Sequence, residues 1–232
     1  MYEDYPEVYK TPNSKDKPIW RYMDFWKFLN LLETSSLYFP SAENLGDNRE
    51  GQFPNEVYEM MLKEDPGYYM FLKNELLNRI KKQTLISSWT YHDNESFAMW
   101  KMYAKDKLGI AIKSDLESLK RSFGKTERII NIGEILYFNK NSFNYKFDNL
   151  DYAFLNKHEY YIFEKEIRCI THCLENEEAG GKLIEVDLHE LFKTIYISPN
   201  AKPEYKKLIE MLKMQYNLDF TIEISEIDDS WL

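Results

Sequence analysis

Cysteine, glycine and positive charge are scarce in this chain. Its 232 residues include 2 Cys and 8 Gly, and 30 Lys+Arg stand against 39 Asp+Glu, which gives a formal net charge of −9. Two cysteines cannot build a disulfide framework. The few glycines form neither a dinucleotide-binding fingerprint nor a phosphate-binding P-loop. The negative charge argues against a protein whose whole surface binds nucleic acid.

Long apolar runs are missing as well. No segment approaches the roughly 18 consecutive apolar residues that a membrane-spanning helix needs, so we expect no membrane partner. The sequence starts with Met-Tyr-Glu-Asp-Tyr-Pro, which has neither the basic nor the apolar stretch of a secretory signal. These features favour a cytoplasmic location.

Aromatic residues, by contrast, are abundant. The chain contains 18 Tyr, 14 Phe and 5 Trp, and this content excludes a disordered protein. Two explanations stay open at this point. The rings are either a background of the composition, or they line a ligand cleft, where they offer flat contact area with a polar tip.

Short apolar and β-branched runs alternate irregularly with helical patterns along the chain. Strands are expected at 19–22, 37–39, 84–90, 109–112, 135–138, 160–170, 183–186, 194–197 and 220–224. The strand at 135–138 is expected to follow a turn at Asn131-Ile132-Gly133, with another strand before that turn. Helices are expected after Asp24 as N-cap, over 54–82 with a break at 65–67, and at 95–103, 115–119, 151–158 and 203–216. We therefore predict a polar N-terminal arm over 1–17. Residues 18–232 are predicted to form a single α+β domain with a mixed, mostly antiparallel sheet flanked by helices.

Metal and serine-nucleophile chemistry find little support. The four histidines, His92, His158, His172 and His189, form no H-E-x-x-H pattern, and Cys169 and Cys173 lack the further ligands of a zinc site. We therefore predict no metal ligands. Ser87 and Ser88 lie in an expected strand rather than in a G-x-S-x-G elbow, which argues against a serine hydrolase.

Three separated segments carry the most informative polar residues. Arg21 lies in the first expected strand, Ser87-Ser88-Trp89-Thr90 in a central one, and Glu164-Lys165-Glu166-Ile167-Arg168 in a late one. A strand would place Glu164, Glu166 and Arg168 on one face, and two neighbouring carboxylates require a cation or a ligand nearby. Arg168 or Arg21 would serve. The alternative is a solvated strand face with an ordinary Glu–Arg pair.

Motifs in these segments resemble a bacterial family called domain of unknown function 2971. The matching segments are Trp20-Arg21-Tyr22, Leu37-Tyr38-Phe39-Pro40-Ser41, Leu45-Gly46-Asp47 with Glu50, Leu85 to Thr90, Ser96 to Tyr103, Gly109 to Ile112, and Phe163 to Arg168. The loop from Gly46 to Glu50 lacks the family's Asn-Asp-Pro, and Asp47 and Glu50 are expected as turn and cap residues. The resemblance implies an α+β fold and a role in phage–host conflict, but it implies no reaction.

A more distant resemblance is to ADP-ribosyltransferases, whose three strand motifs occur here in order. It implies that Glu166 stabilises the cationic ribose, Glu164 orients the acceptor, Arg21 holds the diphosphate and Ser88 braces the site. The expected ligand-binding residues are Tyr22, Ser87, Trp89, Thr90, Trp100, Tyr103 and Arg168. For Trp100 and Tyr103 a place in the core is the alternative, since Phe97 and Ala104 share their helical stripe.

Three functions follow as hypotheses. The first is an ADP-ribosyltransferase or NAD glycohydrolase, with NAD as a substrate rather than a tightly bound cofactor and with a protein or nucleic-acid acceptor. The second is a non-enzymatic sensor that binds a nucleotide or a protein. The third is an effector that acts on nucleic acid through two local basic clusters. Their residues are Lys120, Arg121, Lys125 and Arg128 in one, and Arg79, Lys81 and Lys82 in the other.

Overall fold

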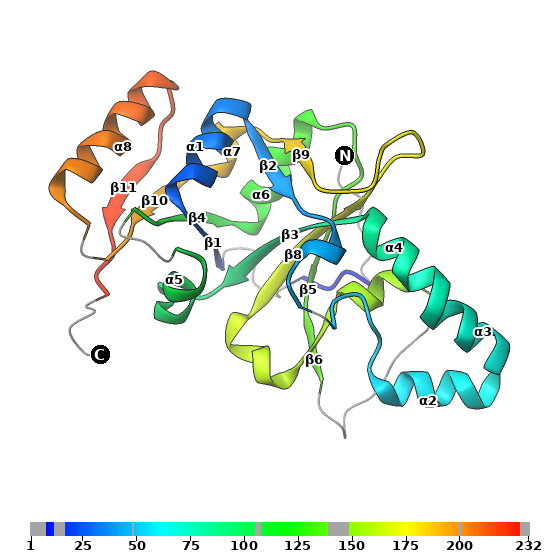
Figure 1. Ribbon diagram of the computed structural model, residues 1–232. Coiled ribbons are helices and arrows are strands. Elements are labelled where there is room, and N and C mark those ends of the chain that lie inside the picture. The colour runs from blue at the N-terminus through cyan, green and yellow to red at the C-terminus, as the bar shows by residue number, and fades with distance from the viewer. Residues whose placement is uncertain are drawn as a thin grey trace.

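A seven-stranded sheet crosses the molecule (Figure 1). The computed structural model describes residues 8–11, 17–47, 49–104, 108–138, 149–199 and 201–227. The strands of this sheet are β1 (Pro18–Met23), β3 (Thr84–Tyr91), β4 (Ile110–Asp115), β5 (Asn131–Glu134), β8 (Glu166–His172), β10 (Thr194–Ile197) and β11 (Thr221–Ile224). Their spatial order is β11-β10-β4-β1-β3-β8-β5. All neighbours are antiparallel except β10 and β11, which are parallel.

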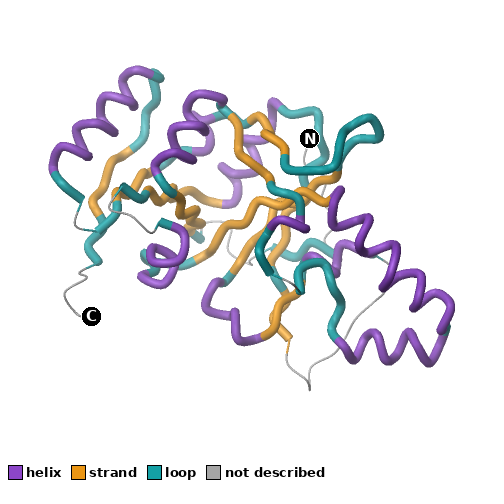
Figure 2. Tube along the Cα trace, viewed as in Figure 1, coloured by secondary structure: helices purple, strands orange, loops and turns teal. Residues whose placement is uncertain are grey.

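Two small sheets and several helices complete the α+β domain, as predicted. Strand β2 (Ser36–Phe39) pairs with β9 (Lys182–Glu185), and β6 (Leu136–Phe138) pairs with β7 (Asn156–His158). The helices are α1 (Phe25–Thr34), α2 (Asn55–Glu64), α3 (Pro66–Phe71), α4 (Leu77–Gln83), α5 (Phe97–Tyr103), α6 (Leu116–Ser122), α7 (Leu188–Leu191) and α8 (Pro203–Gln215). In Figures 1 and 2, α8 lies beside β10 and β11, and α2 to α4 lie at the opposite end.

Short polar side chains cap the starts of several of these helices. The carboxylates of Asp24, Asp65 and Asp115 accept hydrogen bonds from the backbone N–H groups three residues later in α1, α3 and α6. Such N-caps satisfy donors that a helix leaves free at its start. The caps predicted at Asp24 and Asp115 are confirmed.

The central sheet separates two hydrophobic clusters. Leu85 and Ile86 are neighbours on β3, and their side chains point to opposite faces because successive strand residues alternate. Leu85 belongs to the cluster that includes buried residues of α1, α6, α7 and α8, such as Phe28 and Ile209. Ile86 belongs to a second cluster, which includes residues of α2 and α4 and Phe154. A third cluster gathers Trp20, Tyr22, Met99, Trp100, Ala104 and Ala111 between β1, β4 and α5.

The turn expected at residues 131–133 is wrong, because these residues belong to β5, which pairs with β8. Gly133 is needed there for packing rather than for a turn. A Cβ atom at Gly133 would lie 3.1 Å from the Cα of Tyr9, so glycine permits a close approach of two backbones. Tyr9 is itself buried, and the N–H of Glu134 donates to the Lys10 carbonyl. Residues 8–11 of the expected arm are therefore packed, while 1–7 and 12–16 lie outside the described residues.

Two other expected elements differ in kind. The expected strand over 160–170 begins only at Glu166, because Glu159–Glu164 forms a 3₁₀ helix that ends at Lys165 in a left-handed conformation with φ 40°. The expected helix over 151–158 is a 3₁₀ helix, Leu150–Phe154, followed by β7. Within the described residues, every helix is too short or too polar to cross a membrane.

The burial of β3 leads to a test of the core. Leu85→Ala is expected to lower the free energy of unfolding by ~2–5 kcal/mol, because it removes a fully buried side chain from the larger cluster. Leu183→Ala on β9 is the matched control, since Leu183 is 48% exposed and its loss should cost about 0.5 kcal/mol or less. Urea unfolding of both variants measures the difference. Equal losses would contradict this placement of the core.

Candidate functional site

The site begins where β1 and β3 separate. These strands pair only at Ile19↔Tyr91 and Trp20↔Thr90, although β1 pairs with β4 along its whole length. Farther along β3, the N–H of Ile86 donates to the Pro40 carbonyl at 3.0 Å, so the chain after β2 takes the place of β1. Between these two pairings the edge of β3 around Ser88 faces a gap. A cleft of about 670 Å³ opens there.

The cleft brings together most of the residues that the sequence singled out. Its lining includes Arg21, Tyr22, Ser88, Trp89, Thr90, Tyr103, Glu164, Glu166 and Arg168. Two expected residues do not line it. Ser87 is fully buried beneath Arg21, and Trp100 is a core residue whose indole N–H donates to Glu95. The structure thus assembles segments that lie far apart in the sequence, and it places Trp100 in the core, which was the alternative for that residue.

Arg21 bridges the gap between the separated strands. Its guanidinium donates to the Ser87 hydroxyl, to the Ser88 carbonyl at 3.1 Å and to the Tyr38 carbonyl at 3.4 Å. The Ser88 amide N–H faces the same gap, since both backbone groups of a strand residue point to one side. Burial lowers the pKa of Arg21 to about 10, so the group is charged at neutral pH. Among the described residues, no carboxylate forms an ion pair with it.

Arg168, the second arginine of the cleft, has the opposite surroundings. It is 1% exposed, and its guanidinium binds both carboxylate oxygens of Glu50, with Nη2 to Oε2 at 2.8 Å. Its Nε donates to Glu166 at 2.7 Å, and its Nη1 donates to the Phe154 carbonyl at 2.7 Å. The alternative of a solvated strand face is therefore wrong. The expectation that Arg168 supplies a cation to this face is confirmed.

Lys157 extends this network to the second carboxylate. Its ammonium group lies 2.6 Å from Glu164 and 2.7 Å from Glu166. The left-handed conformation of Lys165 lets both glutamates reach the same lysine, although Glu164 ends a 3₁₀ helix and Glu166 begins a strand. The floor of the cleft is thus a chain of ion pairs. It runs Glu50–Arg168–Glu166–Lys157–Glu164.

The two glutamates that share Lys157 differ in acidity. Burial acts to raise the pKa of Glu166, but Arg168 and Lys157 outweigh it and lower the pKa to about 2. Burial also raises the pKa of Glu164, and there Lys157 opposes it only in part. Glu166 is therefore ionised at neutral pH, whereas Glu164 is the carboxylate that more readily takes up a proton. Environments that separate two acidities in this way are typical of paired acid–base groups.

Sequence reasoning missed two members of the network. Glu50 was expected as a turn or cap residue, but it is buried and both its oxygens bind Arg168. Glu50 does lie in a segment that carries the family resemblance, and this resemblance is the one signal in the sequence that points to it. No motif in the sequence marks Lys157. Its place follows from β7, which brings residue 157 beside the start of β8.

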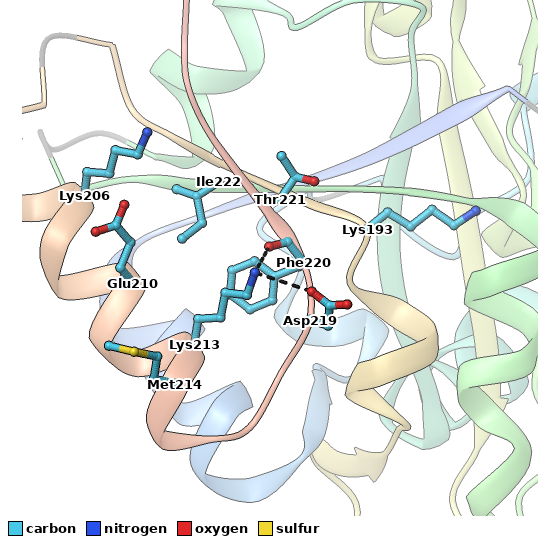
Figure 3. A pocket seen from close by; sticks show the side chains of 9 residues that line it. All are labelled: Lys193, Lys206, Glu210, Lys213, Met214, Asp219, Phe220, Thr221 and Ile222. Carbon is cyan, nitrogen blue, oxygen red and sulfur yellow. Dashed lines mark hydrogen bonds and ion pairs between the residues drawn. The ribbon is translucent and has the colours of Figure 1, made fainter.

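A second hollow, of about 770 Å³, lies between α8 and β11 (Figure 3). Its ammonium groups do not converge, since Lys193 and Lys206 lie on opposite sides of β11. Lys213 binds Asp219 and the Phe220 carbonyl, and Lys193 pairs with Asp115. In the described part of the chain, no group of three or more His, Cys, Asp or Glu side chains is placed to hold a metal ion. The split between β1 and β3 is therefore the candidate site.

The two arginines of the cleft should respond differently to replacement. Arg168→Met removes the cation that the buried Glu50 and Glu166 share, leaves Glu166 with Lys157 alone, and should lower the free energy of unfolding by ~3–5 kcal/mol. Arg21→Met removes hydrogen bonds but strands no carboxylate, so its cost should be about 1 kcal/mol. Chemical unfolding of both variants at neutral pH measures this contrast. A loss at Arg21 as large as that at Arg168 would show that Arg21 has a structural role.

The low pKa of Glu166 predicts acid sensitivity. Its folded-state pKa of about 2 lies below the ordinary value near 4.3, so its contribution is present above that value and is lost as the pH falls towards 2. The free energy of unfolding of the unaltered protein should fall between about pH 5 and pH 2. In Glu166→Gln this fall should be smaller by up to roughly 3 kcal/mol. Urea unfolding across this range provides the measurement. The exposed Glu223→Gln is the control, and an unchanged slope in Glu166→Gln would contradict the assignment.

Comparison with known proteins identifies no family: no family model matches the chain, and no curated protein matches it in sequence. The resemblances to the domain of unknown function 2971 and to ADP-ribosyltransferases therefore stay predictions.

Proposed function

We propose that the cleft binds an NAD-like dinucleotide and cleaves its nicotinamide–ribose bond, as an ADP-ribosyltransferase or an NAD glycohydrolase does. The observation that carries this proposal is the charged Arg21, which has no ion-pair partner among the described residues and shares a cleft with two carboxylates of different acidity. A charge left unpaired at a partly buried position is unfavourable for the free protein. An anionic ligand would compensate it.

The arrangement suits a diphosphate. A guanidinium offers a planar set of donors for phosphate oxygens, and the Ser88 N–H faces the same gap as a further donor. The volume of about 670 Å³ also fits a ligand of this size. Glu166 and Glu164 line the same cleft, so a dinucleotide with its diphosphate at Arg21 would have to extend its ribose towards them.

The two glutamates would then take separate roles. The bond from ribose to nicotinamide breaks with its electron pair leaving on nicotinamide, and a cationic ribose forms. The ionised Glu166 would stabilise this cation. An acceptor hydroxyl or a water molecule attacks the ribose carbon and releases a proton. Glu164 would accept that proton, which its raised pKa favours.

A binding or sensor module is the second candidate. Both oxygens of Glu166 are already engaged by Arg168 and Lys157, as in a carboxylate that organises a site without reacting. A nucleic-acid effector finds less support. The basic residues at 120, 121, 125 and 128 each pair with a carboxylate. A bacterial cytoplasmic protein in phage–host conflict remains the proposed setting, and it rests on the family resemblance alone.

Turnover of NAD by the Glu164→Gln variant tests the proposal. Glutamine keeps a hydrogen-bond acceptor for Lys157 but cannot take a proton, so nicotinamide release should fall ~10²–10⁴-fold. Glu164 is a cleaner target than Glu166, which also holds Arg168. Nicotinamide and ADP-ribosylated products can be followed by mass spectrometry.

Glu223→Gln, a change at an exposed site on β11, is the control and should keep full activity. Undiminished turnover in Glu164→Gln would refute the proposed role of that residue. NAD that stabilises the protein without being consumed would favour the sensor.

A further inference from the structure

We propose that the adenine of the bound nucleotide lies at the α1–β2 end of the cleft, against Trp26 and Tyr38, with the Asn30 side chain binding its edge. This inference rests on the proposed function, because adenine is the end of the dinucleotide that lies away from the reacting ribose. It concerns a different wall of the cleft and different residues.

Trp26 is the most unusual residue on that wall. It lies in the first turn of α1, lines the cleft, and is 74% exposed. A large aromatic side chain that lines a cleft and stays exposed is a typical contact for a flat ligand. Asn30 lies four residues later, so the two side chains share one face of the helix. Asn30 lines the same cleft.

Tyr38 provides a second ring and links this wall to the proposed phosphate site. It is 50% exposed on β2, and its carbonyl accepts a hydrogen bond from Arg21 at 3.4 Å. Gly181 leaves room for the ring, since a Cβ atom there would lie 2.1 Å from the Tyr38 hydroxyl. A base next to a diphosphate at Arg21 could therefore reach this ring.

The rings that the sequence suggested for stacking do not offer their faces. Tyr22, Trp89 and Trp100 are all buried. Tyr103 is 45% exposed, but the charges that act on it come from Glu164, Lys157, Glu166 and Arg168. It therefore belongs to the end where the ribose would react. Of the exposed rings of the cleft, Tyr103 thus lies at the reacting end, and Trp26 and Tyr38 lie at the α1–β2 end.

The amide of Asn30 indicates which base would bind. An amide carries one acceptor and donors side by side, and this pattern matches the N6 donor and N7 acceptor of adenine. Guanine presents two acceptors at the same positions, which suit arginine or lysine. Lys27 lines this wall too, but it already pairs with Asp24 at 2.9 Å. Adenine is therefore favoured over guanine.

Titration calorimetry with ADP, GDP and nicotinamide mononucleotide tests the assignment. The unaltered protein should bind ADP about 10-fold more tightly than GDP. Trp26→Ala should weaken ADP binding roughly 10-fold or more, and Asn30→Ala should reduce the preference for ADP over GDP. Nicotinamide mononucleotide lacks adenine, so neither change should affect it. Tyr160→Ala is the control, because Tyr160 is an exposed ring that does not line the cleft, so its removal should leave ADP binding unchanged.

Failure of this inference can be told apart from failure of the proposed function. ADP affinity that Trp26→Ala leaves unchanged, or no ADP binding to the unaltered protein, overturns the adenine site. Equal affinities for ADP and GDP overturn the choice of base. If Trp26→Ala raises the KM for NAD and leaves kcat unchanged, both proposals stand. Trp26-dependent ADP binding without any NAD turnover keeps the adenine site and removes the enzyme. If Trp26→Ala turns over NAD with an unchanged KM, the proposed enzyme stands and the adenine site is overturned.

Discussion

The buried guanidinium of Arg168 is the interaction on which the cleft depends. It joins three segments that are distant in the sequence: the loop that carries Glu50, the carbonyl of Phe154, and Glu166 at the start of β8. A buried arginine is tolerated only when its charge and donors are matched, and here two carboxylates and a carbonyl do so. Because one oxygen of Glu166 faces Arg168, the other can bind Lys157. The position of Glu164 follows from that contact.

The charge of Arg21 is not balanced by a carboxylate among the described residues. β1 and β3 could have continued their pairing beyond Trp20, yet the chain after β2 takes over the edge of β3 and a gap remains. Arg21 fills the gap with hydrogen bonds to hydroxyl and carbonyl groups, which leave its charge unbalanced. The pairing of β1 with β3 is thus interrupted at Arg21, whereas Arg168 nearby has all its charge matched. Such a local loss of stability is typical of a site that binds a ligand.

Local signals in the sequence predicted much of this fold. Asp24 and Asp115 were recognisable as helix caps, and β3 was recognisable from its β-branched and aromatic residues, because these preferences act over a few residues. The errors arose where a distant contact decides. Gly133 looked like a turn residue, and only the approach of Tyr9 explains it. Glu50 and Lys157 acquire their importance from partners that the sequence does not bring near them.

The charges of the network explain why Glu164 differs from Glu166. Arg168 and Lys157 are two cations among three carboxylates, so one negative charge is in excess. Glu50 and Glu166 both bind Arg168, and Glu166 also shares Lys157, so the excess falls on Glu164. Burial raises the pKa of Glu164, the neighbouring charge of Glu166 acts in the same direction, and Lys157 opposes them only in part. Protonation of Glu164 would make the network neutral. An ion-pair network with one surplus carboxylate at its end therefore leaves at the cleft the carboxylate that most readily takes up a proton, while Arg168 and Lys157 bind its other members.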